Sequence, residues 1–469
     1  MTEVITESIS RISLSPSRQN VYCLIKHEDP ELQPLVVSAF KARLPQDTYK
    51  IISSLDEYPG GPLLQFAAKD SLDLEQAFHQ PRMLISTYVT RDALTRKHLL
   101  GQTYATWVAK NPACLLQTNV KTIANLELNP SESIYDVLED TPLGKILEKN
   151  ETKTNPADRV WWMLRPDLSD GSQDLRLFST VDELQAAFDD FDAEYEREHA
   201  KNAAPAVEAS APAQEEATTS AAAASDEKDT DDHHDTSLAR QSGGGWSSWF
   251  QITVTTEEHT DVVAPKRHVV AQRYVSRPLT FDGCKFQVSA YVVAVGALRV
   301  FVYKPLLALF AAKPFAAPWE HVGEHDLDAH STYDGNVRLF WDLPDKPAGW
   351  KQSVFAQVCA ITGEVFSAAS AKEMGAHFQP LPQSFEVFAV NFAVDYSGKA
   401  MLADIRASPD MLHQTECGTK LSGLVQGLFE EVADVAVKPF FAEGGQDVGA
   451  EVEESERLVK VVDLDCRKI

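Results

Sequence analysis

Apolar and other residues alternate along residues 285–310, whose sequence is KFQVSAYVVAVGALRVFVYKPLLALF. Gly296 interrupts the alternation and Val300 resumes it. Period-two alternation broken by a glycine predicts two antiparallel strands joined by a tight turn. Because apolar residues are nearly continuous, we expect central strands that are covered on both faces. Arg299 and Lys304 leave no apolar run long enough to cross a bilayer.

Further strand-like and helical segments lie on both sides of this hairpin. Alternating or continuously apolar patterns predict strands at residues 20–27, 49–55, 160–165, 175–178, 268–275, 385–394 and 400–405. A turn at residues 395–398 makes the last two strands a second hairpin. Helical spacing predicts helices at residues 35–44, 86–112, 353–369 and 421–435. Thr180 and Glu183 form a capping box before an apolar stripe that begins at Leu184, which predicts the start of another helix.

These elements predict an α+β fold with mixed and antiparallel sheets flanked by helices. The 469 residues are enough for two or three domains. We expect a small N-terminal α/β domain over residues 1–150 and a second domain over residues 151–200 and 246–440. Residues 201–245 are rich in Ala, Ser, Thr, Glu and Asp, which predicts a disordered acidic insert. Residues 441–469 are expected to form an acidic, mobile tail, with a docked strand at 458–462 as the alternative.

Composition narrows the classes of partner. The net charge of −26 argues against nucleic acid or an anionic membrane surface as the main partner, and solubility explains such a charge more simply. The six cysteines have neither CxxC nor zinc-type spacing, which predicts reduced thiols and a cytoplasmic protein. We expect a monomer. No G-x-G-x-x-G, Walker A loop, nucleophile elbow or HExxH motif occurs.

A basic cluster lies in the helix predicted at residues 86–112. Its members are Arg91, Arg96, Lys97 and His98. Such a cluster is most often a solvated helix face, but it also suits the binding of an acidic peptide or a phosphate. Taken alone, the cluster does not decide between the two interpretations.

Several blocks, in the same order along the chain, resemble motifs of the tubulin-tyrosine-ligase family of ATP-grasp ligases. They are STYVTRDALTRKHLL at 86–100, WMLRPDLSDGSQDLRLF at 162–178, VVAQRYV at 269–275, KFQVSAYVV at 285–293 and FAVNFAVDYSGKAMLADIRASP at 388–409. The resemblance covers about residues 86–415 without the acidic insert. It implies an ATP-grasp fold and the use of ATP and Mg²⁺ to join a carboxylate to the amine of an amino acid. It also implies the C-terminal tail of tubulin, or another acidic peptide, as a partner.

The resemblance also assigns roles to residues of this chain. Arg165 stands at a family lysine, Gln272, Tyr274 and Val275 stand at the hinge that contacts adenine, and Lys285 stands at a phosphate contact. Asn391 and Asp404 stand at the family's Asp and Glu metal ligands. Ser289 and Arg406 stand where the family has a catalytic arginine and asparagine. Arg91, Arg96 and Lys97 are the implied substrate-binding residues.

Most of these positions differ from the family pattern in charge. Ser289 cannot replace a cation, Arg406 opposes Mg²⁺ at a metal-ligand position, and Asp174 places a carboxylate in the phosphate loop. Together the changes favour a site that has lost or weakened catalysis, in which Arg165 and Arg406 form a salt bridge to Asp174 or Asp404.

Two alternatives stay open. One is a working ligase, in which Arg165 and Lys285 hold phosphates, Asn391 and Asp404 share one Mg²⁺, and Arg406 replaces a second metal. The other is an acidic scaffold protein that acts through its insert.

Overall fold

The computed structural model describes residues 20–128, 133–167, 175–203, 267–320, 326–332, 336–407, 411, 418–442 and 455–468. The chain divides into two compact units, residues 1–183 with 266–469, and residues 184–265. Most of the second unit, including most of the predicted insert, lies outside the described residues. So do Asp174 in the predicted phosphate loop and residues 443–454 of the predicted tail. Of the second unit the structure describes residues 184–203, which are most of α8 (Val181–Ala203). This helix begins at the predicted capping box, where Glu183 N–H donates to Thr180 Oγ1 at 3.2 Å.

The N-terminal part contains a small α/β layer. Four parallel strands lie in the order β2-β1-β3-β4, and their bounds are Val21–Ile25 (β1), Tyr49–Ile52 (β2), Leu63–Phe66 (β3) and Met83–Ile85 (β4). Helix α1 (Leu32–Arg43) connects the first two strands, and α2 (Leu74–His79) lies between β3 and β4 in sequence. Strands β3 and β4 are short and were not predicted.

A large sheet is centred on β10 (Cys284–Val295), the first strand of the predicted hairpin. One edge of β10 pairs with β14 (Phe385–Val394), which in turn pairs with β15 (Ala400–Ala407). The other edge pairs first with β12 (Leu307–Phe310) and then with β11 (Arg299–Tyr303). All of these pairings are antiparallel, and both predicted hairpins are therefore confirmed. The outer strands are β9 (Thr280–Phe281), β13 (Val337–Leu339) and β16 (Leu458–Asp463).

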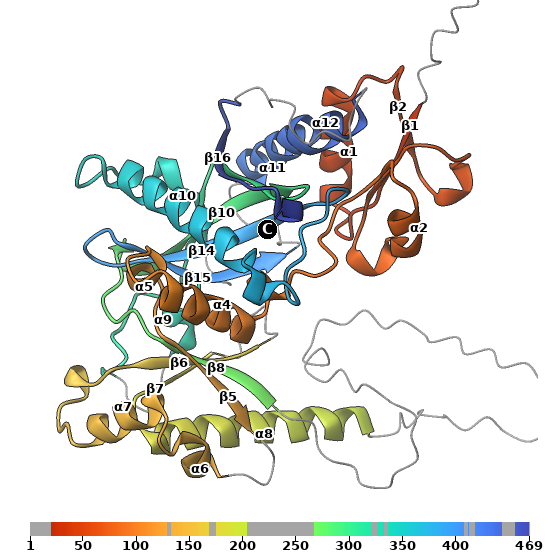
Figure 1. Ribbon diagram of the computed structural model, residues 1–469. Helices are drawn as coiled ribbons and strands as arrows, with labels where there is room; N and C mark the ends of the chain where they lie inside the picture. The colour runs from red at the N-terminus through yellow and green to blue at the C-terminus, as the bar shows by residue number, and fades with distance from the viewer. Residues whose placement is uncertain are drawn as a thin grey trace, which may run out of the picture. The chain divides into compact units, whose positions relative to one another are not determined.

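The alternation in β10 divides its side chains between two cores. Even-numbered residues, from Phe286 to Ala294, pack with α4 (Lys97–Lys110) and α10 (Trp350–Ala369). Tyr291, Val293 and Val295, on the other face, pack with α1 and with α11 (Gly418–Val432). Figure 1 shows α11 and α4 on opposite sides of β10, β14 and β15. Earlier along this second face, the odd-numbered positions are polar and line a pocket.

A smaller antiparallel sheet has the order β5-β8-β6-β7. Its strands are β5 (Ile123–Leu128), β6 (Trp162–Pro166), β7 (Arg176–Phe178) and β8 (Arg267–Arg273). Strand β8, which is green in Figure 1, lies between β5 and β6. The remaining short helices are α5 (Leu116–Asn119), α6 (Ile134–Leu138), α7 (Pro142–Glu151), α9 (Leu327–His330) and α12 (Lys438–Phe441), the last following a π-helical turn at Ala433–Val437.

The helix predicted at residues 86–112 is wrong in its first part. Residues 86–91 are not helical, and the rest is divided into α3 (Asp92–Thr95) and α4. Arg96, between the two helices, has an extended backbone with ψ of 121°, so the first helix ends there and α4 starts as a separate helix. In the first turn of α4, the backbone N–H of His98 donates to the Asp167 carboxylate at 2.9 Å. A residue distant in sequence therefore caps this helix. Among the described helices, none has the length and apolar content needed to cross a membrane.

Candidate nucleotide-binding cleft

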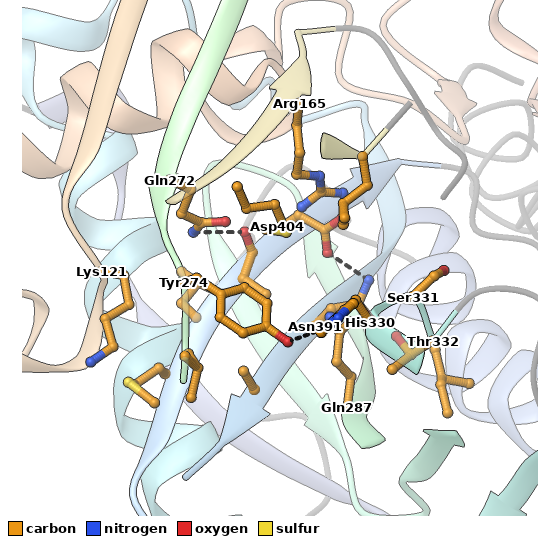
Figure 2. Close-up of a pocket in the computed structure, with 18 of the residues that line it drawn as sticks. Lys121, Arg165, Gln272, Tyr274, Gln287, His330, Ser331, Thr332, Asn391 and Asp404 are labelled. Carbon is orange, nitrogen blue, oxygen red and sulfur yellow. Dashed lines mark hydrogen bonds and ion pairs between the residues drawn. The ribbon is translucent and has the colours of Figure 1, made fainter. Parts of the chain in front are cut away.

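A pocket is lined by residues of both the small sheet and the large sheet. Its volume is about 1020 Å³, including a part that is open to solvent. The residues that the resemblance assigned to nucleotide, metal and catalysis all line it: Arg165, Gln272, Tyr274, Val275, Lys285, Ser289, Asn391, Asp404 and Arg406. Figure 2 shows most of the labelled polar side chains turned toward this pocket. Residues separated by more than two hundred positions therefore meet in one place.

Strand register places three of these residues in a row across the large sheet. Ser289 on β10 lies opposite Asn391 on β14, and Asn391 lies opposite Asp404 on β15. All three are buried. Directly opposed residues on antiparallel strands have neighbouring side chains. The row is therefore a consequence of how the second hairpin pairs with β10.

Asp404 is the centre of an ion-pair cluster in this row. Its Oδ2 lies 3.2 Å from Arg165 Nη2 and 3.4 Å from Arg406 Nε. Its Oδ1 accepts a hydrogen bond of 2.7 Å from Asn391 Nδ2, and Figure 2 shows the carboxylate between Arg165 and Asn391. Of the two carboxylates that the sequence suggested as partners of Arg165 and Arg406, Asp404 contacts both arginines, and Asp174 lies outside the described residues.

The charges around Asp404 determine its ionisation. Burial alone would raise the pKa of Asp404, but its neighbours hold that pKa well below the ordinary value, through Arg406, Arg165, Lys97 and Asn391. Asp404 is therefore ionised and can only accept hydrogen bonds. It follows that Asn391 turns its NH₂ group to Asp404. Asn391 Oδ1 is buried and has no hydrogen-bond partner in the described part of the chain.

Lys285 forms a second buried cluster at the other end of the pocket. Its Nζ donates to the carbonyl oxygen of His330 at 3.0 Å and to the Tyr274 hydroxyl at 3.3 Å. The same Nζ lies 4.7 Å from the centre of the Tyr274 ring, and the Tyr274 hydroxyl is 2.8 Å from His330 Nδ1 (Figure 2). Burial, reinforced by the charge of Arg165, lowers the pKa of Lys285 from 10.5 to about 7. Burial raises the pKa of Tyr274.

The predicted basic cluster lines an adjoining cleft rather than the pocket itself. That cleft shares Asp404 and Arg406 with the pocket and contains Arg96 and Lys97. Asp167, at the end of β6, organises this region: it lies 3.5 Å from Arg96 Nη1 and accepts from Lys97 Nζ through its backbone oxygen at 3.3 Å. These cations are therefore partly engaged within the protein, which the sequence did not indicate.

Arg91 is held more tightly than its neighbours. Its Nη1 lies 2.5 Å from Glu386 Oε1 and also contacts Thr87. Glu386 is 2% exposed and accepts a further hydrogen bond of 3.0 Å from the backbone N–H of Tyr88. Arg91 lines the adjoining cleft, but this buried ion pair gives it a structural role that competes with substrate binding.

Several polar residues of the site carried no signal in the sequence. Lys121, just before β5, and Gln287 on β10 line the pocket. His330 also lines the pocket, where it is the partner of Tyr274 and Lys285. For Gln287, the sequence offers one indication of a place in the site: it alternates with Lys285 and Ser289, so the three share one face of the strand.

Residues 139–443 match the sequence profile described as the tubulin-tyrosine ligase family, which covers well over half of the chain. The chain belongs to the tubulin-tyrosine ligase family. A probable tubulin–tyrosine ligase of Schizosaccharomyces pombe is 29% identical over 437 residues, covering 91% of this chain and 94% of the relative. The probable tubulin–tyrosine ligase Pby1 of Saccharomyces cerevisiae is 28% identical over 450 residues, and this chain spans about half of it (52%).

A solved structure shows the same fold. The C-terminal domain of K. lactis Pby1, described as an ATP-grasp enzyme that interacts with the mRNA decapping enzyme Dcp2, has a TM-score of 0.63 at 24% identity. The likeness covers 95% of this chain and 99% of that one. The predicted fold class, with ATP-grasp-like mixed and antiparallel sheets and flanking helices, is confirmed.

The family implies two bound groups, ATP and Mg²⁺, and the residues of the pocket suit them unequally. Met163, Leu175 and Leu402 give the pocket apolar walls of the kind that hold a planar base, and its cations suit phosphates. Mg²⁺ prefers several oxygen ligands in octahedral geometry. Here Asp404 is already paired with two arginines, and no group of three metal-binding side chains occurs within the described residues. The pocket therefore fits a nucleotide, whereas the arrangement around Asp404 does not fit Mg²⁺.

Proposed function

We propose that this tubulin-tyrosine-ligase-family protein uses its ATP-grasp cleft to bind a nucleotide and does not carry out the family's ligation reaction. The observation that carries the proposal is the pairing of Asp404 with both Arg165 and Arg406. Activating a carboxylate with ATP requires Mg²⁺ and well-placed cations to neutralise the charge that develops on the phosphates. In this chain the remaining carboxylate at the metal position is neutralised by side chains instead.

Two further positions support the same conclusion. Ser289 stands where the family has an arginine, and it is buried directly opposite Asn391, which replaces a carboxylate. The row Ser289–Asn391–Asp404 therefore contains a single charged group. Cations near it come from Arg165 and Arg406, and both already interact with that group.

The test compares the wild type with a variant in which the family pattern is restored at four positions. Ser289→Arg, Asn391→Asp, Asp404→Glu and Arg406→Asn are combined, and ATP-dependent release of phosphate and incorporation of tyrosine into tubulin are measured with Mg²⁺. We expect neither reaction in the wild type, at any Mg²⁺ concentration. Mg²⁺-dependent tyrosine incorporation by the wild type would overturn the proposal. Lys285→Ala, which removes the buried ammonium from the pocket, is the control for nucleotide binding.

An active ligase with a rearranged site is the second candidate, and the unpartnered oxygen of Asn391 favours it. Asn391 lines the pocket beside Asp404, and its Oδ1 has no hydrogen-bond partner within the described residues, so the two side chains could share one metal ion if the arginines moved away. The same assay distinguishes the two candidates, because only an active ligase would incorporate tyrosine when ATP and Mg²⁺ are present.

For partners and location we propose an acidic peptide, such as the tail of tubulin, bound at the cleft that contains Arg96 and Lys97 in the cytoplasm. The cations of this cleft and the free state of the five described cysteines support this proposal. A partner from the mRNA-decapping machinery is the alternative, by analogy with Pby1. Binding of each candidate, measured with and without the substitutions Arg96→Ala and Lys97→Ala, separates them.

A further inference from the structure

Four cations lie around the turn between β14 and β15, beside the nucleotide pocket. We call them the hairpin patch, and they are Lys121, Arg273, Arg277 and Lys399. Lys121 and Arg273 line the pocket, and Figure 2 shows the amine of Lys121 turned away from the other labelled side chains. Burial and the charges of Arg273 and Lys399 lower the pKa of Lys121, so these three cations lie close together. Arg277 is joined to the turn, because its backbone oxygen accepts a hydrogen bond of 3.0 Å from the N–H of Tyr396.

The protein itself neutralises little of this charge. None of the four side chains forms a hydrogen bond or an ion pair with another residue in the described part of the chain. Asp395 also acts on Lys121, but its Oδ1 accepts hydrogen bonds from two backbone N–H groups of its own turn, at 2.9 and 3.0 Å. Four cations and one carboxylate leave an excess of positive charge. The cleft of Arg96 and Lys97 differs, because Asp167 contacts both of those cations.

An exposed aromatic side chain accompanies the hairpin patch. Tyr396 is 66% exposed, the highest fraction among the exposed large hydrophobic side chains of the described residues. Its turn is fixed by the hydrogen bond to Arg277, by those to Asp395, and by one of 3.0 Å from Gln357 Nε2 to the oxygen of Gly398. A side chain on a fixed backbone loses less conformational entropy when a partner binds. Tyrosine and arginine are also among the residues that contribute most to binding energy in protein interfaces.

We propose that the hairpin patch docks an acidic segment of a partner protein, with an apolar or aromatic residue among its carboxylates. The carboxylates would contact the four cations, which give up no internal ion pair on binding, and the apolar residue would contact Tyr396. The net charge of −26 opposes a nucleic-acid strand, whose charges repeat at every phosphate, more than it opposes a short acidic segment. This inference goes beyond the proposed function, because it requires neither the nucleotide nor the cleft of Arg96 and Lys97.

The experiment is fluorescence anisotropy with the full chain and labelled synthetic peptides. The main probe is a polyglutamate peptide with one central phenylalanine, and its two controls replace either the phenylalanine by alanine or every glutamate by glutamine. We expect the main probe to bind, with an affinity that falls about tenfold as salt is raised from about 0.05 to about 0.3 M. The alanine peptide should bind about fivefold more weakly, and the glutamine peptide should not bind. An oligouridine of the same net charge tests for nucleic acid.

Variants that leave the pocket lining intact locate the binding surface. Arg277→Gln combined with Lys399→Gln should weaken binding of the main probe by at least about tenfold. Tyr396→Ala should weaken it by about fivefold, whereas Tyr396→Phe should keep the affinity of the wild type.

The matched control is Arg338→Gln combined with Lys145→Gln, two exposed cations that pair with Asp282 and Asp140. It removes the same charge and should change the affinity by less than about twofold. Thermal melting verifies that each variant is folded.

The outcomes separate this inference from the proposed function. Equal affinities of the wild type and the Arg277→Gln, Lys399→Gln variant would overturn the inference, and so would an equal loss in the control pair. A loss confined to Arg96→Ala would place the acidic segment in the other cleft. Tighter binding of oligouridine than of the main probe would make the patch a nucleic-acid surface, which also overturns the inference. Failure of the wild type to bind ATP, with peptide binding retained, would overturn the proposed function alone.

Discussion

Asp404 is a buried carboxylate that two arginines and one amide contact within 3.4 Å. Replacing it by Asn removes the negative charge but retains the approximate shape of the side chain. Arg165 and Arg406 would then lose the carboxylate that they share in a partly dehydrated site. We therefore expect Asp404→Asn to lower the free energy of unfolding by about 3 kcal/mol at pH 7, measured by urea denaturation.

The pH dependence of this effect follows from the lowered pKa of Asp404. A carboxyl group whose pKa is lower in the folded state contributes stability above its unfolded pKa of about 4, and this is lost as the pH falls below that value. The difference between variant and wild type should thus be the same at pH 7 and pH 5. Asp282→Asn is the matched control, since Asp282 pairs with Arg338 on the surface and should cost less than about 0.5 kcal/mol. Equal losses for the two variants would contradict the prediction.

Lys285 predicts a pH dependence of the same sign in a higher pH interval, through the relief of a buried charge. Its pKa is lowered to about 7 by burial and by Arg165, so between pH 7 and about 10 the unfolded chain binds more protons than the folded one. The stability of the wild type should therefore rise with pH in this interval relative to Lys285→Met, by about 2–4 kcal/mol in total. Chemical denaturation of both proteins at pH 6.5, 8 and 9.5 measures the difference. Parallel curves would show that the lysine keeps an ordinary pKa.

At the scale of elements, the packing of α10 against β16 depends on one glycine. A Cβ atom added to Gly363 in α10 would lie 2.9 Å from the backbone oxygen of Val461 in β16. That oxygen belongs to Val461 at the bulge of β16, and the residues on both sides of it pair with β11, which limits how far it can move. We expect Gly363→Ala to destabilise the protein by about 1–3 kcal/mol, although alanine is intrinsically the better helix former.

Gly423 in α11 provides the matched control. A Cβ atom there meets nothing within 4 Å, so Gly423→Ala should stabilise the protein by about 0.5–1 kcal/mol through helix propensity alone. Thermal unfolding of the two variants should shift in opposite directions. A stabilised Gly363→Ala would mean that β16 is not packed closely against α10.

The same scale shows what could be predicted from the sequence. The hairpin around Gly296 was predicted because its alternation and its turn are local features of the chain. Strand β12 was not predicted as a separate strand and was included in that hairpin. It pairs with the first half of β10, and nothing in the sequence indicates that β10 has this second partner on the same edge. The break between α3 and α4 was missed because its cause, Asp167, lies about seventy residues away.

The candidate site divides in a similar way. Family motifs assigned positions such as Asn391 and Asp404, and the salt bridge of Arg165 and Arg406 with Asp404 followed from charge alone. The row of Ser289, Asn391 and Asp404 required the register between β10, β14 and β15, which depends on tertiary pairing. The commitment of Arg91 to Glu386 could not be predicted, since it joins residues nearly three hundred positions apart.

At the scale of the whole molecule, the question is whether the acidic insert contributes to the cleft. Every described residue that lines the pocket belongs to the unit made of residues 1–183 and 266–469. Strand β8, which follows the insert, is held by pairing with β5 and β6 on its two edges. We therefore expect a protein in which residues 204–262, which are most of the predicted insert and the segment that follows it, are replaced by a Gly/Ser linker to retain the fold and the cleft.

A linker of about 30 residues, roughly half the original length, should lower the entropic cost of closing the loop by about 0.6 kcal/mol. The unfolding midpoint should therefore not fall, and the affinity for ATP should stay within about twofold of the wild type. A Gly/Ser linker of the full length is the control for length. Loss of ATP binding in both proteins would mean that residues of the insert contribute to the site, whereas loss in the short one alone would mean that the linker strains β8. Retained ATP binding with loss of a protein partner would assign partner binding to the insert and nucleotide binding to the cleft.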